Sequence, residues 1–266
     1  MQAYVYGAWM AAATMLDSFA DSDKAAVFRE KASALQERFD GTFFDEALGT
    51  YVLALDGDKR PCRVRSSTAG HVLFTGLARQ ERVARLVETL MAPPSLSGWG
   101  IRTIPTTEVR YNPMSYHNGS VSPHDNALIA AGFARYGFRT EAARIFEGLT
   151  AASTYVDLRR LPELFCGFPR RPAQGPTFYP VACIPQAWAA AAPLFLLQSC
   201  LGLSFDPQAE QILFAEPTLP YDLDELLIRH MRVCGGEADI LLRRSGRKVV
   251  VDVPHRTGNV RVLSLI

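Results

Sequence analysis

Paired helical segments, separated by long loops that differ from one another, constrain the fold of this chain more than any other feature of its sequence. Apolar residues at helical spacing predict three such pairs, over residues 9–19 with 22–39, 68–77 with 80–91, and 125–136 with 140–154. A repeat solenoid needs similar pairs at a fixed period with short connections. The unequal loops therefore favour a mainly α domain built from distinct helical hairpins.

Two of the loops, residues 93–123 and 157–185, are unusually long for a compact domain. Segments of this length without regular structure are commonly either functional or disordered. The Trp, Tyr and Arg content of the first loop argues against disorder, so we expect it to carry function. A shorter interval, residues 43–58, alternates β-prone runs with Gly-containing turns and predicts a β-hairpin or an ordered loop.

The pattern changes after the last predicted helix, residues 186–203, whose many alanines suit close helix packing. Beyond it, short β-prone runs alternate with Gly-containing turns, which is typical of an antiparallel sheet. These runs cover residues 212–214, 226–228, 238–242, 248–253 and 260–265. The sequence thus predicts a helical domain over residues 1–203 and a small carboxy-terminal antiparallel β-sheet over residues 204–266.

Charge and cysteine content disfavour several classes of function. The chain carries 28 Lys+Arg and 27 Asp+Glu, intermixed, for a net charge of +1. Neither nucleic acid nor an anionic membrane is therefore an expected partner. Its five cysteines form no CxxC pair, which argues against a zinc site and favours reduced thiols. We expect no metal and no cofactor.

No targeting or membrane segment is recognisable in the sequence. Residues 1–6 lack the basic and apolar regions of a secretory signal. The apolar stretch at residues 187–203 is short for a bilayer span and is interrupted by Pro193 and Gln198. A cytoplasmic location is the expectation that follows.

Three loop segments concentrate the residue types that bind sugars, namely aromatic rings, carboxylates, amides and guanidinium groups. The first combines residues 66–71, which end at His71, with residues 97–103, which contain Trp99 and Arg102. Trp99 is equally well explained as a ring packed beneath its own loop. The residue types of this segment therefore indicate either a sugar-facing indole or a core side chain.

The second segment, residues 111–126, holds Tyr116, His117, Asn118 and Asp125 just before a predicted helix. Two aromatic or imidazole rings, an amide and a carboxylate in so short a stretch suit the recognition of sugar hydroxyls. Taken alone, Asp125 is better explained as the N-cap of that helix.

The third segment, residues 159–168, contains Glu163 among apolar and aromatic neighbours. Desolvation in such surroundings perturbs a carboxyl group, as it does in many catalytic sites. A buried ion pair with Arg159 or Arg160 is the structural alternative. Glycoside hydrolysis commonly takes two carboxyl groups, an acid and a base or nucleophile, and the sequence alone pairs Glu163 with no partner.

At these segments the chain resembles bacterial amylo-α-1,6-glucosidases of the glycogen-debranching type, which belong to the six-hairpin glycosidase superfamily. The likeness is strongest at YNPMSYHNGS (111–120), LPELFCGF (161–168) and YPVAC (179–183). It extends along essentially the whole chain and corresponds to the carboxy-terminal half of those proteins.

The resemblance implies an (α/α)6 toroid, incomplete here at its amino terminus, whose loops at one end form the sugar pocket. It also implies an inverting mechanism on α-linked glucosides with Glu163 as the catalytic base. The substrate-binding residues that it implies are Trp99, Arg102, Tyr116, His117, Asn118, Asp125 and His71. The acid in such enzymes is typically an Asp in the amino-terminal half, which we expect this chain to lack.

One position departs from the family pattern, because Ser122 stands where the family has a Trp before a Pro. This change removes a surface on which a sugar ring stacks. Two other interpretations stay open: a fragment that binds a glycan without cleaving it or is inactive, and a toroid epimerase or lyase that uses His71 or His117 as a base. An oligosaccharide or polysaccharide is the expected partner, and an apolar flank left exposed by absent helices predicts self-association.

Overall fold

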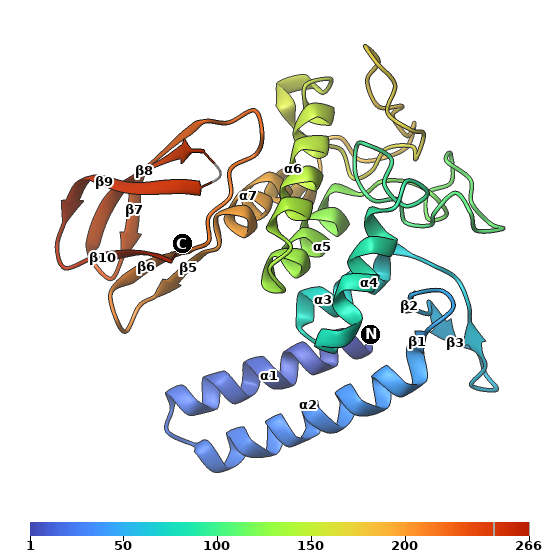
Figure 1. The fold of residues 1–266 in the computed structure, drawn as a ribbon, viewed down its shortest axis with the longest axis horizontal. Helices are drawn as coiled ribbons and strands as arrows, with labels where there is room; N and C mark the ends of the chain where they lie inside the picture. Colours follow the sequence, from blue (N-terminus) through green and yellow to red (C-terminus); the bar gives the residue numbers. More distant parts are fainter. Residues whose placement is uncertain (247, 266) are drawn as a thin grey trace.

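The computed structural model describes residues 1–246 and 248–265 and begins with a helical hairpin. Helix α1 (Gln2–Ser18) packs along helix α2 (Ser22–Phe43), as Figure 1 shows in blue. Asp21 caps α2, because its carboxylate accepts a hydrogen bond from the backbone N–H of Lys24 at 3.3 Å. The cap therefore lies directly before the first residue of the helix, Ser22.

The other helices gather around α5, which packs against α3, α6 and α7. Their bounds are Gly70–Thr75 for α3, preceded by the 3-10 turn Ser67–Ala69, Gln80–Met91 for α4, Pro123–Arg135 for α5, Arg139–Ser153 for α6 and Ala187–Leu201 for α7. Ile129, Ala130 and Phe133 of α5 are fully buried in the core. A Cβ at Gly132 would lie 2.6 Å from the backbone nitrogen of Phe74, so α5 and α3 approach as closely as glycine permits. The predicted bounds of α3 to α7 agree with these to within two residues. The first pair is longer than predicted, because α1 begins at Gln2 rather than at residue 9 and α2 ends at Phe43 rather than at residue 39.

The predicted hairpin over residues 43–58 is a pair of small two-stranded sheets. Strand β1 (Phe44–Asp45) pairs with β2 (Thr50–Tyr51), and β3 (Ala54–Leu55) pairs with β4 (Pro61–Cys62), all antiparallel. The hydroxyl of the buried Tyr51 donates to Asp40 at 2.9 Å, which anchors this region on α2.

The carboxy-terminal module consists of two three-stranded sheets, with strand orders β10-β6-β5 and β7-β8-β9. The strands are β5 (Leu203–Asp206), β6 (Gln211–Ala215), β7 (Glu225–Val233), β8 (Gly236–Ser245), β9 (Lys248–Thr257) and β10 (Arg261–Leu265). The pairing of β10 with β6 is parallel and the other pairings are antiparallel. The prediction of one antiparallel sheet was therefore wrong in the number of sheets and in this one pairing.

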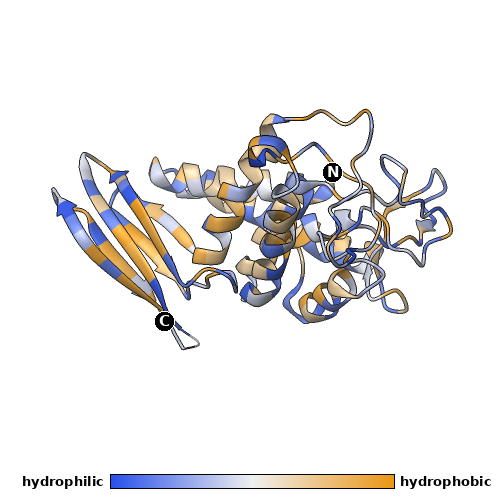
Figure 2. Cartoon of the chain, turned by 90° about the horizontal axis from the view of Figure 1, so that it is seen from above, coloured by the Kyte–Doolittle hydropathy of each residue, from blue (hydrophilic) through white to orange (hydrophobic). Residues whose placement is uncertain are grey.

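Each part of the chain has its own apolar cluster (Figure 2). Buried residues alternate with half-buried ones along β6 and most of β8, and the buried Ile212, Phe214, Ile240 and Leu242 belong to one apolar cluster that both sheets share. This alternation explains why the β runs were recognisable in the sequence. Pairing partners were not recognisable, because period-two alternation says which face a residue occupies and not which strand lies beside it.

The helical part joins the β module at a tight turn after α7. Gly202 takes a left-handed conformation with φ 55°, and a Cβ there would lie 2.1 Å from the carbonyl oxygen of Ala215. Arg139 of α6 donates to that same oxygen at 3.1 Å, and Thr218 N–H donates to the carbonyl of Cys200 at 2.9 Å. Within the described residues, no helix is both long and apolar enough to cross a membrane.

Candidate functional site

The three loop segments singled out in the sequence meet at one end of the helices. Val121 and Phe165 exchange backbone hydrogen bonds of 2.9 and 3.0 Å. Val121 also forms an antiparallel bridge with Arg102, and Phe165 forms one with Phe178. Segments that are far apart in the sequence are thus held side by side by short β-bridges.

These loops, together with the first turns of α5 and α7, enclose one side of a cavity of about 660 Å³. Its wall contains five of the eight predicted site residues. They are Tyr116, His117, Asn118, Asp125 and Glu163.

Glu163 reaches the cavity from the third loop and is held by donors on several sides. Its backbone N–H donates to the carbonyl of Cys183 at 3.0 Å, and the N–H of Cys183 donates back to Glu163 Oε2 at 3.4 Å. A hydrogen bond from the Tyr116 hydroxyl lowers the pKa of Glu163, and donors from Cys183 and Gln186 act in the same direction. The carboxyl group is therefore ionised at neutral pH and half-buried at the cavity wall. No ion pair between Glu163 and Arg159 or Arg160 is present among the described contacts.

Tyr116, His117 and Asn118, from the second loop segment, form a further part of the wall. The hydrogen bond to Glu163, together with burial, raises the pKa of Tyr116 to about 12, so its hydroxyl keeps its proton. The Tyr116 ring meets Tyr179 edge to face, with centroids 5.4 Å apart. The backbone at Asn118 is fixed by hydrogen bonds with Asn112 and Ser115, which leaves the Asn118 side chain as part of the wall.

Asp125 is not a helix cap. The N-cap of α5 is Ser122, which makes no side-chain capping bond, and Asp125 Oδ1 lies 2.5 Å from Nε2 of His71. The other ring nitrogen of His71, Nδ1, lies 2.6 Å from the Tyr4 hydroxyl. His71 thus has both nitrogens engaged and does not line the cavity itself. The neighbouring Asn126 connects α5 to the first loop segment, because its side-chain amide forms hydrogen bonds with both the N–H and the carbonyl of Ile101, at 2.6 and 3.0 Å.

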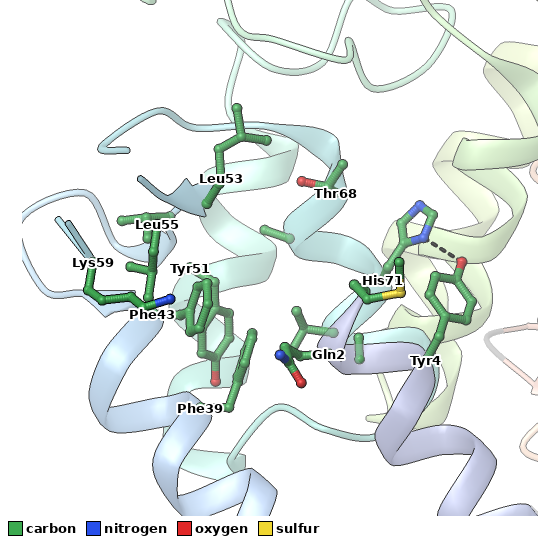
Figure 3. Close-up of a pocket in the computed structure, with 16 residues that line it drawn as sticks. Gln2, Tyr4, Phe39, Phe43, Tyr51, Leu53, Leu55, Lys59, Thr68 and His71 are labelled. Carbon is green, nitrogen blue, oxygen red and sulfur yellow. Dashed lines mark hydrogen bonds between the residues drawn. The ribbon is translucent and has the colours of Figure 1, made fainter. Parts of the chain in front are cut away.

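A second cavity, of about 600 Å³, lies on the other side of His71 (Figure 3). It shares Leu53 and Thr68 with the first cavity and is walled mainly by aromatic and aliphatic side chains from α2 and the small strands. Figure 3 shows Tyr4 of α1 pointing at the His71 ring from below. His71 therefore lines the second cavity and is joined to the wall of the first through its hydrogen bond with Asp125.

Trp188, on the first turn of α7, is a residue that the sequence reasoning missed. Its side chain lines the cavity, is 53% exposed and stacks on His124, with centroids 4.2 Å apart and planes 13° from parallel. Burial lowers the pKa of His124, which keeps that ring neutral. An indole is thus present in the cavity although Ser122 is not a Trp, and it is contributed by a different element. The available signal was an isolated Trp at the polar start of an apolar helix.

Trp99 and Arg102 lie outside this cavity. Trp99 is 2% exposed, with the Arg170 guanidinium 4.6 Å above its ring. Arg102 is equally buried, and its guanidinium donates to the carbonyl of Gly167 at 2.6 Å and to those of Pro93 and Pro94. Both side chains hold the loops together, so we do not include them among the proposed substrate contacts. No group of three metal-ligating side chains converges among the described residues.

The chain belongs to a known family of glycoside hydrolases. Its residues 1–164 match the profile of the mannosylglycerate hydrolase MGH1-like glycoside hydrolase domain. Among curated proteins, none matches this chain.

Several solved structures have a fold similar to that of this chain. A sialidase matches with a TM-score of 0.75 and 15% identity over 95% of this chain and 24% of its own. A GH63 mannosylglycerate hydrolase from Thermus thermophilus matches with a TM-score of 0.56 and 21% identity over 73% of this chain and 44% of its own. The neutral trehalase Nth1 from Saccharomyces cerevisiae matches with a TM-score of 0.56 and 18% identity over 75% and 37%.

At these identities the likeness concerns the fold alone, and it supports an α-toroid-like class for the helical part. The prediction of the six-hairpin glycosidase superfamily is confirmed by the family match and these neighbours. The chain spans less than half the length of each of these three structures.

Proposed function

We propose that this chain contributes the general base, Glu163, and a large part of the sugar-binding cavity of an inverting α-glycosidase. One observation carries the proposal: Glu163 lies at the wall of a cavity of about 660 Å³ with its pKa lowered by the Tyr116 hydroxyl. An inverting glycosidase needs a carboxylate that takes a proton from the attacking water. A base that is ionised at neutral pH and reaches a cavity meets that need.

The rest of the cavity supports the binding of a sugar. The exposed face of Trp188 suits the C–H surface of a pyranose, and Asn118 and Asp125 offer an amide and a carboxylate to its hydroxyls. The volume of the cavity is within the range of small-ligand sites. His117, which is exposed at the rim, suits a substrate unit outside the cavity.

We propose a narrower substrate class than the family name gives. The sequence resemblance favours an α-linked glucoside of the debranching type, whereas the matching family is named for mannosylglycerate hydrolysis. Both descriptions name a hexose, glucose or mannose, as the sugar unit, and the sequence resemblance adds the α linkage. We therefore propose an α-D-hexopyranoside as the substrate and test gluco and manno configurations side by side.

Asp125 and Glu163 are carboxylates of the same cavity wall, and they differ in their surroundings. Because Asp125 accepts a hydrogen bond from His71, we assign it to substrate binding rather than to protonation of the leaving group. The test below therefore uses leaving groups that need no general acid.

The experiment is hydrolysis of α-D-glucosyl fluoride and α-D-mannosyl fluoride, with the configuration of the released sugar followed by proton NMR. Fluoride departs without protonation, so the rate reports on the base. We expect the β-anomer as first product and a rate lowered by about 10²–10⁴-fold in Glu163→Gln. Glu30→Gln, an exposed carboxylate on α2, is the control and keeps the wild-type rate.

Three results would contradict the proposal. Release of the α-anomer would mean retention, an unchanged rate in Glu163→Gln would exclude it as the base, and absence of hydrolysis of both fluorides would leave a glycan-binding chain. An unsaturated product absorbing in the ultraviolet would indicate a lyase, although both ring nitrogens of His71 are already engaged and no observation favours that reaction.

A further inference from the structure

Three side chains from three helices form a chain of hydrogen bonds that ends at the cavity wall. Tyr4 comes from α1, His71 from α3 and Asp125 from α5. The Tyr4 hydroxyl lies 2.6 Å from Nδ1 of His71, and Nε2 of His71 lies 2.5 Å from Oδ1 of Asp125. The side chains of His71 and Asp125 are 17% and 10% exposed, so the second hydrogen bond is largely shielded from solvent.

The direction of these hydrogen bonds follows from what each group can do. A carboxylate oxygen accepts, so we assign the ring proton of His71 to Nε2, which faces Oδ1 of Asp125. In that tautomer Nδ1 offers a lone pair, and the Tyr4 hydroxyl donates to it. Tyr4 thus fixes the tautomer in which His71 faces Asp125 with a donor.

Asp125 is left with an acceptor that no protein group uses. Its Oδ2 is buried and has no hydrogen-bond partner among the described residues. The residue is 7% exposed and lines the cavity with its remaining surface. A buried carboxylate oxygen without a donor is costly, and native structures keep one where a ligand or a functional step supplies the missing partner.

We propose that Tyr4 and His71 are positioning residues that hold the carboxylate of Asp125 as the acceptor for a hydroxyl group of the bound sugar. The assignment rests on the proposed function, since it takes the cavity to be the sugar site. The sequence resemblance made His71 a substrate contact, whereas here His71 acts on the substrate only through Asp125.

The competing explanation is that the three side chains merely tie α1, α3 and α5 together. Two substitutions of His71 separate these possibilities. The amide of Gln reaches the position of Nε2 and keeps a donor toward Asp125, whereas the amide of Asn reaches the position of Nδ1 and keeps only the contact with Tyr4. Both remove the ring, so a purely structural tie is weakened by both.

The probes are methyl α-D-glucopyranoside and methyl α-D-mannopyranoside, titrated calorimetrically into each protein. We expect His71→Asn to weaken binding of the preferred glycoside by about tenfold or more, and His71→Gln to stay within about threefold of wild type. Thermal unfolding of the two variants is measured in parallel and is expected to be the same. Equal losses of affinity in both, or no loss in either, would overturn the assignment, as would a wild-type chain that binds neither glycoside.

The hydrogen bond between Tyr4 and His71 has its own test. Tyr4→Phe removes the hydroxyl that fixes the tautomer and is expected to weaken binding by about threefold, less than His71→Asn. Tyr6 is on the same helix, and its hydroxyl makes no hydrogen bond within the described residues, so Tyr6→Phe is expected to bind as the wild type does. A loss in Tyr6→Phe equal to that in Tyr4→Phe would contradict the positioning of His71.

Failure of this inference is distinguishable from failure of the proposed function. The contrast between His71→Asn and His71→Gln is read from equilibrium binding, whereas the action of Glu163 is read from fluoride hydrolysis. A chain that hydrolyses the fluorides but binds equally in both His71 variants keeps its base and loses this assignment. If the two His71 variants differ in binding as expected but Glu163→Gln hydrolyses the fluorides at the wild-type rate, the assignment of Tyr4 and His71 stands and Glu163 is not the base.

Discussion

The two ends of α7 differ in how far their side chains are buried. At its first turn, Trp188 is 53% exposed in the cavity and its indole N–H donates to Gln186, which in turn donates to Glu163. At its last turn, Cys200 and Leu201 are fully buried, and the chain passes directly into β5. One helix thus carries an end that faces the cavity and an end that belongs to the core.

The difference shows where function and stability are separated in this molecule. The junction with the β module leaves little open: Arg139 donates to a carbonyl of β6, and the N–H of Tyr221 donates to Glu147 at 2.7 Å. The cavity end keeps a half-buried carboxylate at Glu163, an exposed indole and, within the part of the chain that the structure describes, an acceptor of Asp125 without a donor. Groups left open at one end of a well-packed scaffold are the ones available to a ligand.

The largest effect is expected at the junction, from Gly202→Ala. A Cβ there meets the carbonyl oxygen of Ala215 at 2.1 Å, and the left-handed backbone adds its own strain. We expect the free energy of unfolding to fall by about 3 kcal/mol, measured by chemical denaturation, with the affinity of the folded protein for methyl glycosides unchanged.

Gly137→Ala is the matched control for this loss. Gly137 is also left-handed, at φ 86°, but has open space where its Cβ would be. Only the backbone strain of about 1 kcal/mol is then expected. Equal destabilisation by both changes would mean that the close approach of Gly202 to β6 contributes nothing.

A smaller effect of the opposite kind is expected at the cavity end, from Trp188→Ala. Loss of an exposed stacking face is expected to weaken glycoside binding by about tenfold, while the midpoint of thermal unfolding stays near that of the wild type. Phe19→Ala, which removes a ring that is 75% exposed at the far end of α1, controls for the loss of an exposed aromatic side chain. Unchanged affinity in Trp188→Ala would remove the indole from the proposed sugar site.

The smallest effect is a shift in pH dependence caused by Tyr116→Phe. The Tyr116 hydroxyl is the largest cause of the lowered pKa of Glu163, and the base acts in its deprotonated form. Without that hydroxyl the pKa of Glu163 rises, so activity is lost at a higher pH as the solution is acidified. The acidic limb of the pH–rate profile for glycosyl fluoride hydrolysis measures this shift, and a limb that stays in place or moves to lower pH would contradict the pairing of Tyr116 with Glu163.

Much of the fold and part of the site were predictable from the sequence, because local patterns report local structure. Apolar residues at helical spacing placed α4 at residues 80–91, the bounds that the structure has. Concentration of polar and aromatic residues in loops identified Tyr116, Asn118 and Glu163, which the structure brings to one cavity. The same criterion selected Trp99 and Arg102, because composition does not distinguish a side chain that faces a cavity from one that holds a loop in place.

The sequence by itself determined where most helices and strands form, where the helical part gives way to β structure, and which loops supply side chains to the cavity. Only the tertiary structure decided which side chains share a space. It placed Trp188 of α7 beside His124 of α5, and it joined Tyr4, His71 and Asp125 across three helices. The physical reason is that periodicity and turn chemistry act between residues near in sequence, whereas a cavity is formed by packing between distant segments, which no local pattern records.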